Sequence, residues 1–465
     1  MKNLLQRAYP YVPVFLQNLG ISAYGYVYKR ERFGAAFAPT CAEFAERDRW
    51  DPDRMHSYVT ASLRTVLRRA FDAPFYRDNW SRAGVCEADL AEMTPQNLHR
   101  LPLLAKEALR RAPMAFVPDR GVPVRGLLSY FSSGSTGTPI RAICTRASQQ
   151  RFAAAREVRS YNWAGTSIRR PRAMIGGQPI IPAESNGPPY YRYNYAERQV
   201  YLSAYHISAH TIGNYVDGVN RYRPELFTGY AFSQYQVARL MHEHRLAFAS
   251  PLRAAITSSE ALTAPMREII RHSWGCRAYQ EYGSVESCGL ATECEFGSLH
   301  VHPDFGIVEV VDEDGGPVPP GVEGRIVCTG LLNDAQFLVR YEIGDTGVWS
   351  GEPCPCGREH LPVLSAITGR VEDAVTSLDG RKLVRFHGVV IDLPFVLQAQ
   401  VVQEALDRFT VRVLAEEGFG NTEAAEIKRR MQARLGLVDI TVQRVTELER
   451  NSRGKVRAVI SHVRA

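Results

Sequence analysis

Lysine is scarce in this chain of 465 residues. Lysine and arginine together number 56, and only six of them are lysines: Lys2, Lys29, Lys106, Lys382, Lys428 and Lys455. A lysine inside a motif is therefore seldom there by chance. The 49 acidic residues leave a net charge of +7, which is mild for this length. The basic residues form only short clusters, so we interpret them as solvated helix faces and not as a nucleic-acid-binding surface.

Cysteine is also sparse. Nine cysteines are few for this length and odd in number, which excludes the disulfide framework of a small secreted protein. Hydrophobic residues at 45% and charged residues at 23% are ordinary for a globular protein and exclude disordered, collagen-like and coiled-coil chains. At about 100–200 residues per domain, the length favours two to four domains.

Long apolar runs are absent except near the amino terminus. Residues 8–28 carry no formal charge and are numerous enough to span a bilayer. Pro10, Pro13 and several polar residues keep the hydrophobicity of this segment modest, and no signal-peptide cleavage site follows it. We expect the segment to pack on the body of the protein, with peripheral membrane contact as the alternative. The expected location of the protein is the cytoplasm.

Helical and strand-like periods alternate through residues 1–370, which predicts an α/β fold with a large multi-layer body and mixed sheets. Residues 1–95 are expected to be mostly helical. Further along, helices are predicted within 54–71, 145–164 and 233–245, and strands within 126–131, 140–144, 306–311 and 324–328. Asp314-Gly315-Gly316 lies between the last two strands and predicts a hairpin.

The pattern changes after Arg370. Strand-like runs at 384–391, 410–414, 440–445 and 455–463, with a helical run at 422–435, predict a compact α+β unit. We therefore expect two domains, an amino-terminal body (1–370) and a small, mobile carboxyl-terminal lid (371–465).

A run of hydroxyl residues and glycines separates the strands predicted at 126–131 and 140–144. It reads Ser132-Ser133-Gly134-Ser135-Thr136-Gly137-Thr138-Pro139. Glycine permits close backbone approaches, and hydroxyl and backbone N–H groups donate to phosphate oxygens. The run is not a Walker loop, because the G-x-x-x-x-G-K-[ST] pattern is missing. A flexible surface turn would not need hydroxyls at five of eight positions, so we favour a phosphate-binding loop.

Four further strings point to nucleotide chemistry, each weakly when taken alone. Tyr282-Gly283-Ser284-Val285-Glu286 offers an aromatic face for a base and a carboxylate for Mg²⁺. Asp345 ends a string that begins at Arg340, and a carboxylate after a glycine turn suits two ribose hydroxyls. Gly369-Arg370, with Asp373 after it, lies at the predicted domain boundary. Asn451–Lys455 places one of the rare lysines near the carboxyl terminus.

In this order, the five motifs resemble those of the adenylate-forming superfamily of acyl-CoA synthetases, luciferases and peptide-synthetase adenylation domains. The closer likeness is to phenylacetate–CoA ligases and their capsule-polysaccharide-associated relatives. It rests on Leu101–Lys106, Thr257–Glu260 and Cys354–Arg358, while Leu16–Leu19 is similar to the polysaccharide-associated branch. The resemblance covers about residues 100–465.

The resemblance implies a role for each matching residue. Tyr282 would stack on adenine, Asp345 would bind the ribose hydroxyls with help from Arg370, and Glu286 would bind Mg²⁺. Lys455 would bridge the substrate carboxylate and the α-phosphate, and Asp373 would lie at the hinge. Val285 stands where the family usually has Thr, which weakens a contact to the α-phosphate. The remaining ATP contacts would come from Ser132, Ser133, Gly134, Ser135, Thr136, Gly137, Thr138, Ser259, Glu260 and Gly283.

The implied activity is that of an AMP-forming acid–thiol ligase. A carboxylate attacks the α-phosphorus of ATP, and the CoA thiol then takes the acyl group. Aromatic acids are among the candidate substrates. One alternative acceptor is an amine or a carrier-protein thiol in polysaccharide or natural-product biosynthesis; another alternative is a non-catalytic scaffold in polysaccharide assembly. The expected partners are a small carboxylic acid and CoA or another acceptor. We expect no nucleic-acid partner and no stable membrane insertion. A homodimer is one option for the oligomeric state.

Three sulfurs and one imidazole form a candidate zinc site. Cys294, His300, Cys354 and Cys356 make a full tetrahedral set, and similar sets occur in the phenylacetate–CoA ligase relatives. We expect a structural Zn²⁺ that pins two loops beside the nucleotide pocket. The alternative ligands are Cys288, His302 and His360, and the four side chains could also be unrelated.

The acid pocket is the least defined part of the prediction. Candidate walls are Gly176–Pro182, Tyr190–Tyr195, Tyr205–His206 and Phe227–Tyr235. Their aromatic residues favour an aryl or other flat acid, although aromatic residues are more often core. His206 is interpreted either as a contact to the carboxylate or as a structural histidine.

Overall fold

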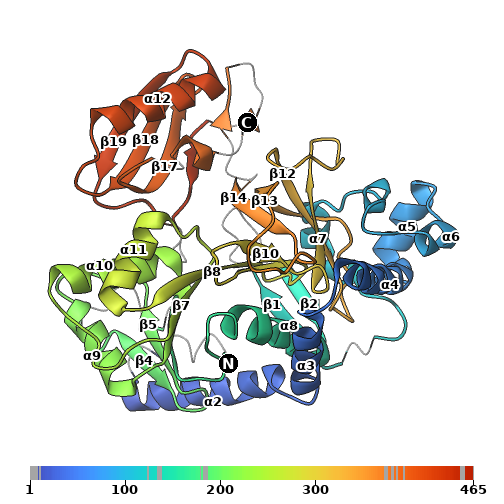
Figure 1. The fold of residues 1–465 in the computed structure, drawn as a ribbon, viewed down its shortest axis with the longest axis horizontal. Helices are drawn as coiled ribbons and strands as arrows, with labels where there is room; N and C mark the ends of the chain where they lie inside the picture. Colours follow the sequence, from blue (N-terminus) through green and yellow to red (C-terminus); the bar gives the residue numbers. More distant parts are fainter. Residues whose placement is uncertain are drawn as a thin grey trace.

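The computed structural model describes residues 9, 12–122, 125–132, 139–177, 180–181, 187–370, 375–378, 382–383, 386–390, 393–450 and 456–463. Among these residues, the largest sheet has twelve strands in the order β11-β12-β13-β14-β10-β9-β8-β7-β6-β3-β5-β4 (Figure 1). The strands are β3 (Arg172–Gly176), β4 (Tyr191–Asn194), β5 (Gln199–Ser203), β6 (Leu226–Tyr230), β7 (Ala254–Ser258), β8 (Arg277–Gly283), β9 (Leu290–Glu293), β10 (Leu299–Val301), β11 (Gly306–Val311), β12 (Glu323–Gly330), β13 (Tyr341–Trp349) and β14 (Val363–Arg370). The predicted mixed α/β fold is confirmed.

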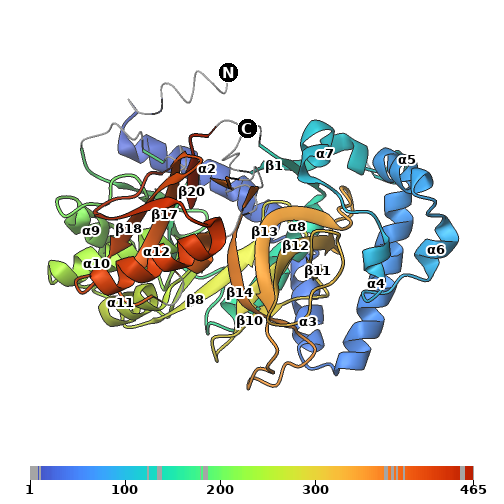
Figure 2. The ribbon, with the colours of Figure 1, turned by 90° about the horizontal axis from the view of Figure 1, so that it is seen from above.

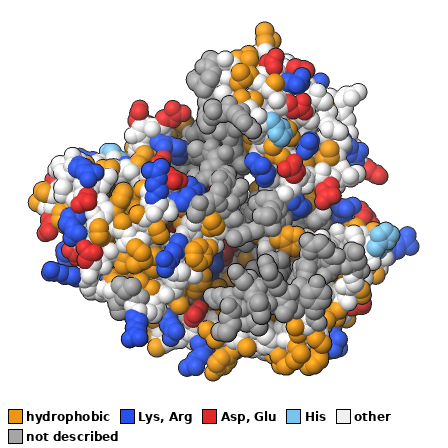
Figure 3. All heavy atoms as spheres, turned by 180° about the vertical axis from the view of Figure 1, so that it is seen from behind, with side chains coloured by type: hydrophobic (Ala, Val, Ile, Leu, Met, Phe, Trp, Pro, Cys, Tyr) orange, Lys and Arg blue, Asp and Glu red, His pale blue; other side chains and the backbone are white. Residues whose placement is uncertain are grey.

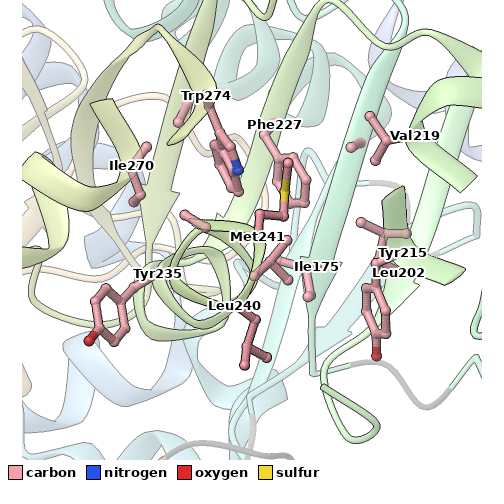
Figure 4. Packing of buried hydrophobic residues seen from close by; sticks show 14 of the residues in the cluster. Ile175, Leu202, Tyr215, Val219, Phe227, Tyr235, Leu240, Met241, Ile270 and Trp274 are labelled. Atoms are coloured by element: carbon pink, nitrogen blue, oxygen red, sulfur yellow. The ribbon is translucent and has the colours of Figure 1, made fainter. Parts of the chain in front are cut away.

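One half of this sheet is mainly parallel. β5, β3, β6, β7 and β8 run parallel, with β4 as an antiparallel edge. The helices α9 (Ile212–Tyr222), α10 (Ala231–Glu243) and α11 (Ala264–Trp274) cover one face. Apolar side chains of both layers interlock there (Figure 4), and Phe227 stacks on Trp274 with ring centroids 4.6 Å apart. Parallel strands need crossover connections, usually helical, which explains the alternating sequence periods.

The opposite face of the parallel strands is covered by α2 (Val14–Arg32) and α8 (Arg146–Arg156). α8 occupies the helix predicted within 145–164, but it ends earlier and continues as a π-helical turn, Glu157–Tyr161. Tyr161 and Ala164 then pack on the apolar residues of β6 and β7. Both helices therefore stand between the sheet and the solvent.

Helix α2 turns polar residues toward the protein. Asn18 is buried and its Oδ1 accepts from the backbone N–H of Tyr193 in β4 at 3.0 Å. Six apolar or aromatic side chains of α2 are exposed: Phe15, Leu16, Leu19, Tyr24, Tyr26 and Val27. Hydrophobic side chains gather along the lower edge of Figure 3, where α2 lies. The predicted packing of this segment on the body is confirmed for its described residues, and no described helix is long and apolar enough to cross a membrane.

The other half of the sheet is antiparallel. β11 and β12 form the predicted hairpin, with Gly306 opposite Gly330. In the turn, Oδ1 of Asp312 accepts from the backbone N–H groups of Asp314 and Gly316 at 3.0 and 2.8 Å. Gly315 has a φ of +86°, which a residue with a side chain rarely adopts. The turn sequence therefore fixes the register of this hairpin.

Short helices precede the sheet, as predicted for the described part of residues 1–95. All of them except α3, which packs on α8, share a core with β12 and β13 (Figure 2). The helix α4 begins after Asp51, whose side chain accepts from the N–H of Arg54 at 2.8 Å, and Pro52 takes the first helical position. These elements are α3 (Phe37–Arg47), α4 (Pro52–Phe71), α5 (Pro74–Arg82), α6 (Glu87–Ala91), η2 (Leu98–Arg100), α7 (Lys106–Arg111) and η3 (Pro113–Phe116).

A smaller sheet lies near the carboxyl terminus, with the order β19-β18-β17-β20 and α12 packed on it. These elements are β17 (Val396–Ala405), β18 (Arg408–Ala415), α12 (Asn421–Leu435), β19 (Asp439–Val445) and β20 (Val459–Ser461). A short pair, β15 (Val375–Thr376) and β16 (Lys382–Leu383), precedes them. Figure 2 shows the small sheet beside α11, and Leu397 of β17 joins the core of the body.

One prediction in this region is wrong, and one strand was not predicted. The strand predicted over 384–391 is a 3-10 turn, η5 (Phe386–Val389), in its described part. The central strand β17 was not predicted, because three glutamines, Gln398, Gln400 and Gln403, interrupt its apolar pattern. Gln400 and Gln403 are buried there because their amides bond the backbone of Arg457 at 2.8 Å and of Thr376 at 2.6 Å.

Candidate active site

A cavity of about 1970 Å³ opens at the carboxyl ends of β6, β7 and β8. Its walls come from both sheets, since Ser258 and Tyr282 of the body and Leu397 and Val456 near the small sheet all line it. Ligands of parallel α/β sheets bind at this edge, because the loops that follow the strands meet there.

Two residues that are predicted to contact the nucleotide, Tyr282 and Asp345, are hydrogen-bonded to each other in the wall of this cavity. Tyr282 at the end of β8 donates its hydroxyl to Oδ2 of Asp345 in β13 at 2.9 Å, and both residues line the cavity. Burial and the charge of Asp345 raise the pKa of Tyr282 well above its ordinary value, so the phenol stays a neutral donor. Motifs 63 residues apart in the sequence are thus joined in one wall.

Glu286 follows the Tyr-Gly motif and lies buried at the cavity wall. The hydroxyl of Tyr341 donates to its Oε1 at 2.9 Å, which fixes the orientation of the carboxylate. Carboxylate oxygens are the hard ligands that Mg²⁺ prefers, so the residue type and its placement suit the predicted Mg²⁺ contact.

The loop after β7 also reaches the cavity, as the resemblance implies. Ser259 adopts a φ of +70°, a conformation uncommon for a residue with a side chain. Oε2 of Glu260 accepts from the backbone N–H of Phe232 in the first turn of α10 at 3.0 Å. Glu260 therefore holds α10 in place as well as lining the cavity.

Only the start of the phosphate loop is among the described residues. It is carried by an antiparallel pair, β1 (Leu128–Phe131) and β2 (Arg141–Cys144). Ser132 closes this pair, because its Oγ accepts from the N–H of Ile140 at 2.8 Å, and it lines the cavity. The loop residues Ser133, Gly134, Ser135, Thr136, Gly137 and Thr138 lie outside the described residues.

Three predicted residues are described in part or not at all. The backbone of Arg370 pairs with Asp345 in the β13–β14 ladder, while its side chain lies outside the described part. Asp373 and Lys455 also lie outside it. The residue after Lys455, Val456, lines the cavity and pairs with Arg450, whose guanidinium lies 4.7 Å from the ring centroid of Phe232.

The structure adds cavity residues that the sequence analysis did not assign. Lys106 donates its Nζ to the carbonyl of Ile343 at 3.0 Å and lines the cavity. Lysine is rare in this chain, so a lysine inside the motif Leu101–Lys106 was a signal that could have identified this residue. Arg156 and Glu281 also line the cavity as an ion pair, with 3.1 Å between Nη2 and Oε1. Nothing in the sequence distinguishes Arg156 from the many other arginines.

The predicted acid-pocket walls divide into two groups. Gly176 and Thr228–Tyr230 line the cavity, whereas Tyr190–Tyr195 and Tyr205–His206 are not among its described walls. His206 bonds the Oγ of Ser203 through Nδ1 at 2.7 Å and stacks on Tyr190 with centroids 4.9 Å apart. These contacts favour the structural interpretation of His206.

Beside the cavity, the four predicted zinc ligands come together. The sulfurs of Cys294, Cys354 and Cys356 and one nitrogen of His300 all lie within 4.8 Å of one another. Nε2 of His300 lies 3.3 Å from the sulfur of Cys356, while its Nδ1 bonds the carbonyl of Leu361 at 2.8 Å. Such a carbonyl partner fixes a metal-binding tautomer, so the donor set fits Zn²⁺.

The alternative ligands are not part of this described cluster. His302 lies behind it and bonds the hydroxyl of Thr292 at 2.7 Å through Nε2. The cluster joins the β9–β10 turn to the loop before β14. Because Ser298 and Ser350 from these two segments line the cavity, the cluster pins two loops at its edge.

Comparison with known proteins agrees with this architecture. Residues 380–462 match the family described as the CapK C-terminal domain. The chain is 22% identical to Protein CapK of Staphylococcus aureus, over 99% of this chain and all of that protein. It is 28% identical to a phenylacetate-coenzyme A ligase of Thermus thermophilus, over 69% of this chain and 71% of that ligase.

A solved 2-hydroxyisobutyryl-CoA ligase has the same fold. In its postadenylation state, with R3-HIB-AMP, the TM-score is 0.65 at 22% identity, covering 87% of this chain and 88% of that one. An open conformation of that ligase, with 2-HIB-AMP and CoA, gives a TM-score of 0.56.

The fold is thus that of the acyl-CoA ligases in the adenylate-forming superfamily. The chain is similar to CapK and to the phenylacetate-coenzyme A ligases, as its motifs predicted.

Proposed function

We propose that this protein is an AMP-forming acid–thiol ligase. It activates a carboxylic acid with ATP as an acyl-adenylate and passes the acyl group to the thiol of CoA. The bond between Tyr282 and Asp345 carries this proposal, because it joins the base-binding and ribose-binding motifs in one cavity wall. The similar ligase that was solved with 2-HIB-AMP and CoA supports the choice of nucleotide and acceptor.

In this proposal, the residues around the cavity position two anions against each other. Ser132 and the loop after it bind the β- and γ-phosphates, Tyr282 covers the base, and Asp345 with Arg370 binds the ribose. Glu286 would hold Mg²⁺, which would neutralise phosphate charge. Lys455 approaches the α-phosphate and the acid carboxylate, where a cation lowers the barrier to attack.

The same proposal assigns motion to the carboxyl-terminal unit. Residues 1–370 form the nucleotide-binding body and residues 371–465 form a lid that rotates about Asp373 between the two half-reactions. The contact of Arg450 with Phe232 supports a lid face that meets the body beside the cavity. A structural Zn²⁺ at Cys294, His300, Cys354 and Cys356 would hold the two loops at the cavity edge.

The test is acid-dependent exchange of labelled pyrophosphate into ATP over a panel of carboxylic acids. Exchange together with a CoA ester supports the proposal. Exchange without a CoA ester would favour an amine or carrier-protein thiol as acceptor. No exchange with any acid would favour a non-catalytic scaffold.

A further inference from the structure

The cavity continues from the nucleotide end into a space between the parallel strands and the helices α2 and α8. Arg32 of α2, Arg156 of α8, Arg172 of β3 and Glu281 of β8 all line this inner part. Tyrosines line it as well, among them Tyr28, Tyr161 and Tyr201. The surface that a ligand meets here is polar and carries three guanidinium groups against one carboxylate.

A further carboxylate lies against two of these arginines without lining the cavity. Glu197 accepts from Nη2 of Arg172 at 3.0 Å and also pairs with Arg32. One carboxylate thus serves two guanidinium groups, while Glu281 pairs with Arg156. Three guanidinium groups therefore share two carboxylates, which leaves one positive charge in excess.

Arg156 is the arginine that a ligand reaches first. Its side chain lines the cavity and is 43% exposed, against 9% for Arg32 and 6% for Arg172. A Cβ added to Gly283 would lie 3.6 Å from Nη2 of Arg156. The guanidinium therefore adjoins the Tyr-Gly motif at the nucleotide end of this space.

The deeper arginines lack full compensation among the described residues. Nε of Arg32 is buried and has no hydrogen-bond partner there. Burial, and next the charge of Arg32, lower the pKa of Arg172 to about 10. An anion bound in this space would give Nε of Arg32 a partner and would counter the lowering of the pKa of Arg172, since a buried charge is costly unless paired.

Neutral donors complete the surface. Burial raises the pKa of Tyr161 to about 12, so its phenol keeps its proton at physiological pH and can donate. Phenol and guanidinium groups together suit the oxygens of a carboxylate, sulfonate or phosphate.

We propose that the acid substrate carries a second anionic group, which Arg156 binds in the space between α8 and the sheet. This inference rests on the proposed function. It narrows the substrate from acids in general to dicarboxylic acids, or to acids with a sulfonate or phosphate. The faces of the tyrosines still fit a flat or aromatic body between the two anionic ends.

The experiment compares acids of matched skeleton, such as benzoate with the three benzenedicarboxylates and hexanoate with adipate. Binding is measured by calorimetry in the presence of AMP, and pyrophosphate exchange is measured separately. The wild type should bind and turn over at least one diacid about tenfold better than its matched monoacid. In Arg156→Gln this ratio should fall to about one, and Arg156→Lys should keep part of it. Arg146→Gln, an exposed site on the same helix, should leave the ratio unchanged.

Each outcome has a distinct meaning. If Arg156→Gln loses binding and exchange equally for monoacids and diacids, Arg156 acts at the reacting carboxylate and the inference is overturned. A wild type that prefers monoacids or amino acids would also overturn it. A diacid that binds through Arg156 without any exchange would uphold the inference and contradict the proposed function. If Arg156→Gln does not fold, Glu281→Gln serves instead: it frees Arg156, so diacid binding should hold or strengthen, and its loss would contradict the inference.

Discussion

The hydroxyl of Tyr282 donates to Oδ2 of Asp345 at 2.9 Å across the wall of the cavity. The two residues come from separate motifs, and neither motif is specific alone. Their contact makes the base-binding and ribose-binding ends of the proposed site one unit, so changes at one residue should alter what the other contributes.

We therefore expect Tyr282→Phe and Asp345→Ala to act non-additively on ATP binding. A hydrogen bond to a charged group contributes about 1.5–3 kcal/mol, so the coupling energy in a double-mutant cycle should fall in that range. The cycle is measured by calorimetry with ATP and Mg²⁺. Strictly additive effects would mean that the two side chains serve separate purposes.

Lys455→Ala should lower pyrophosphate exchange by orders of magnitude while leaving thermal unfolding unchanged. The reason is that a cation between two anions acts on the transition state more than on the fold. Lys428→Ala is the matched control, because Lys428 lies exposed on α12. Exchange at the wild-type rate in Lys455→Ala would remove Lys455 from the mechanism.

Glu286→Gln should lower exchange by at least about a hundredfold and raise the Mg²⁺ concentration needed for half-maximal rate. Glutamine keeps an acceptor for the hydroxyl of Tyr341 but lacks the charge that a divalent ion prefers. The measurement is exchange across a Mg²⁺ titration. An unchanged Mg²⁺ dependence would assign Glu286 a purely structural part.

Purified protein should carry about one zinc per chain, since four soft donor atoms lie within 4.8 Å of one another. Metal analysis of wild type and Cys354→Ser checks this, together with thermal unfolding. The variant should lose the metal and unfold at lower temperature, whereas Cys86→Ser, at an exposed cysteine, should do neither. Wild-type protein without bound metal, or zinc retained in Cys354→Ser, would contradict the site.

Acid should destabilise the fold through Asp304. Burial alone would raise the pKa of this carboxyl, but Arg159 and Arg47 outweigh it and hold the pKa below its ordinary value. The folded state thus favours the charged form, and the stability it contributes is present above about pH 4 and is lost as pH falls through the lowered pKa.

Urea unfolding between pH 7 and pH 3 measures this contribution. In Asp304→Asn the free energy of unfolding at pH 7 should fall by about 3 kcal/mol, because the buried Arg159 loses one of its two carboxylate partners and keeps only Asp48. The free energy of unfolding of Asp304→Asn should also depend less steeply on pH than that of the wild type. Parallel curves for both proteins would mean that Asp304 does not cause the acid sensitivity.

The sequence predicted those parts of the molecule whose pattern is local. The β11–β12 hairpin followed from Asp314-Gly315-Gly316, and the Cys/His cluster followed from residue type. It did not predict β17, because the buried amides of Gln400 and Gln403 find partners only once the distant chain has folded around them. Arg156 was missed for a related reason: its exposure to the cavity depends on which face of α8 meets the sheet.

The most direct test of the account follows the oxygens of the acid. An acid that supports exchange is labelled with ¹⁸O in its carboxylate and turned over with ATP and CoA. Attack of the carboxylate on the α-phosphorus followed by thiol transfer leaves one labelled oxygen on AMP per turnover. The account predicts labelled AMP with unlabelled pyrophosphate. Unlabelled AMP, or label in pyrophosphate or inorganic phosphate, would contradict it.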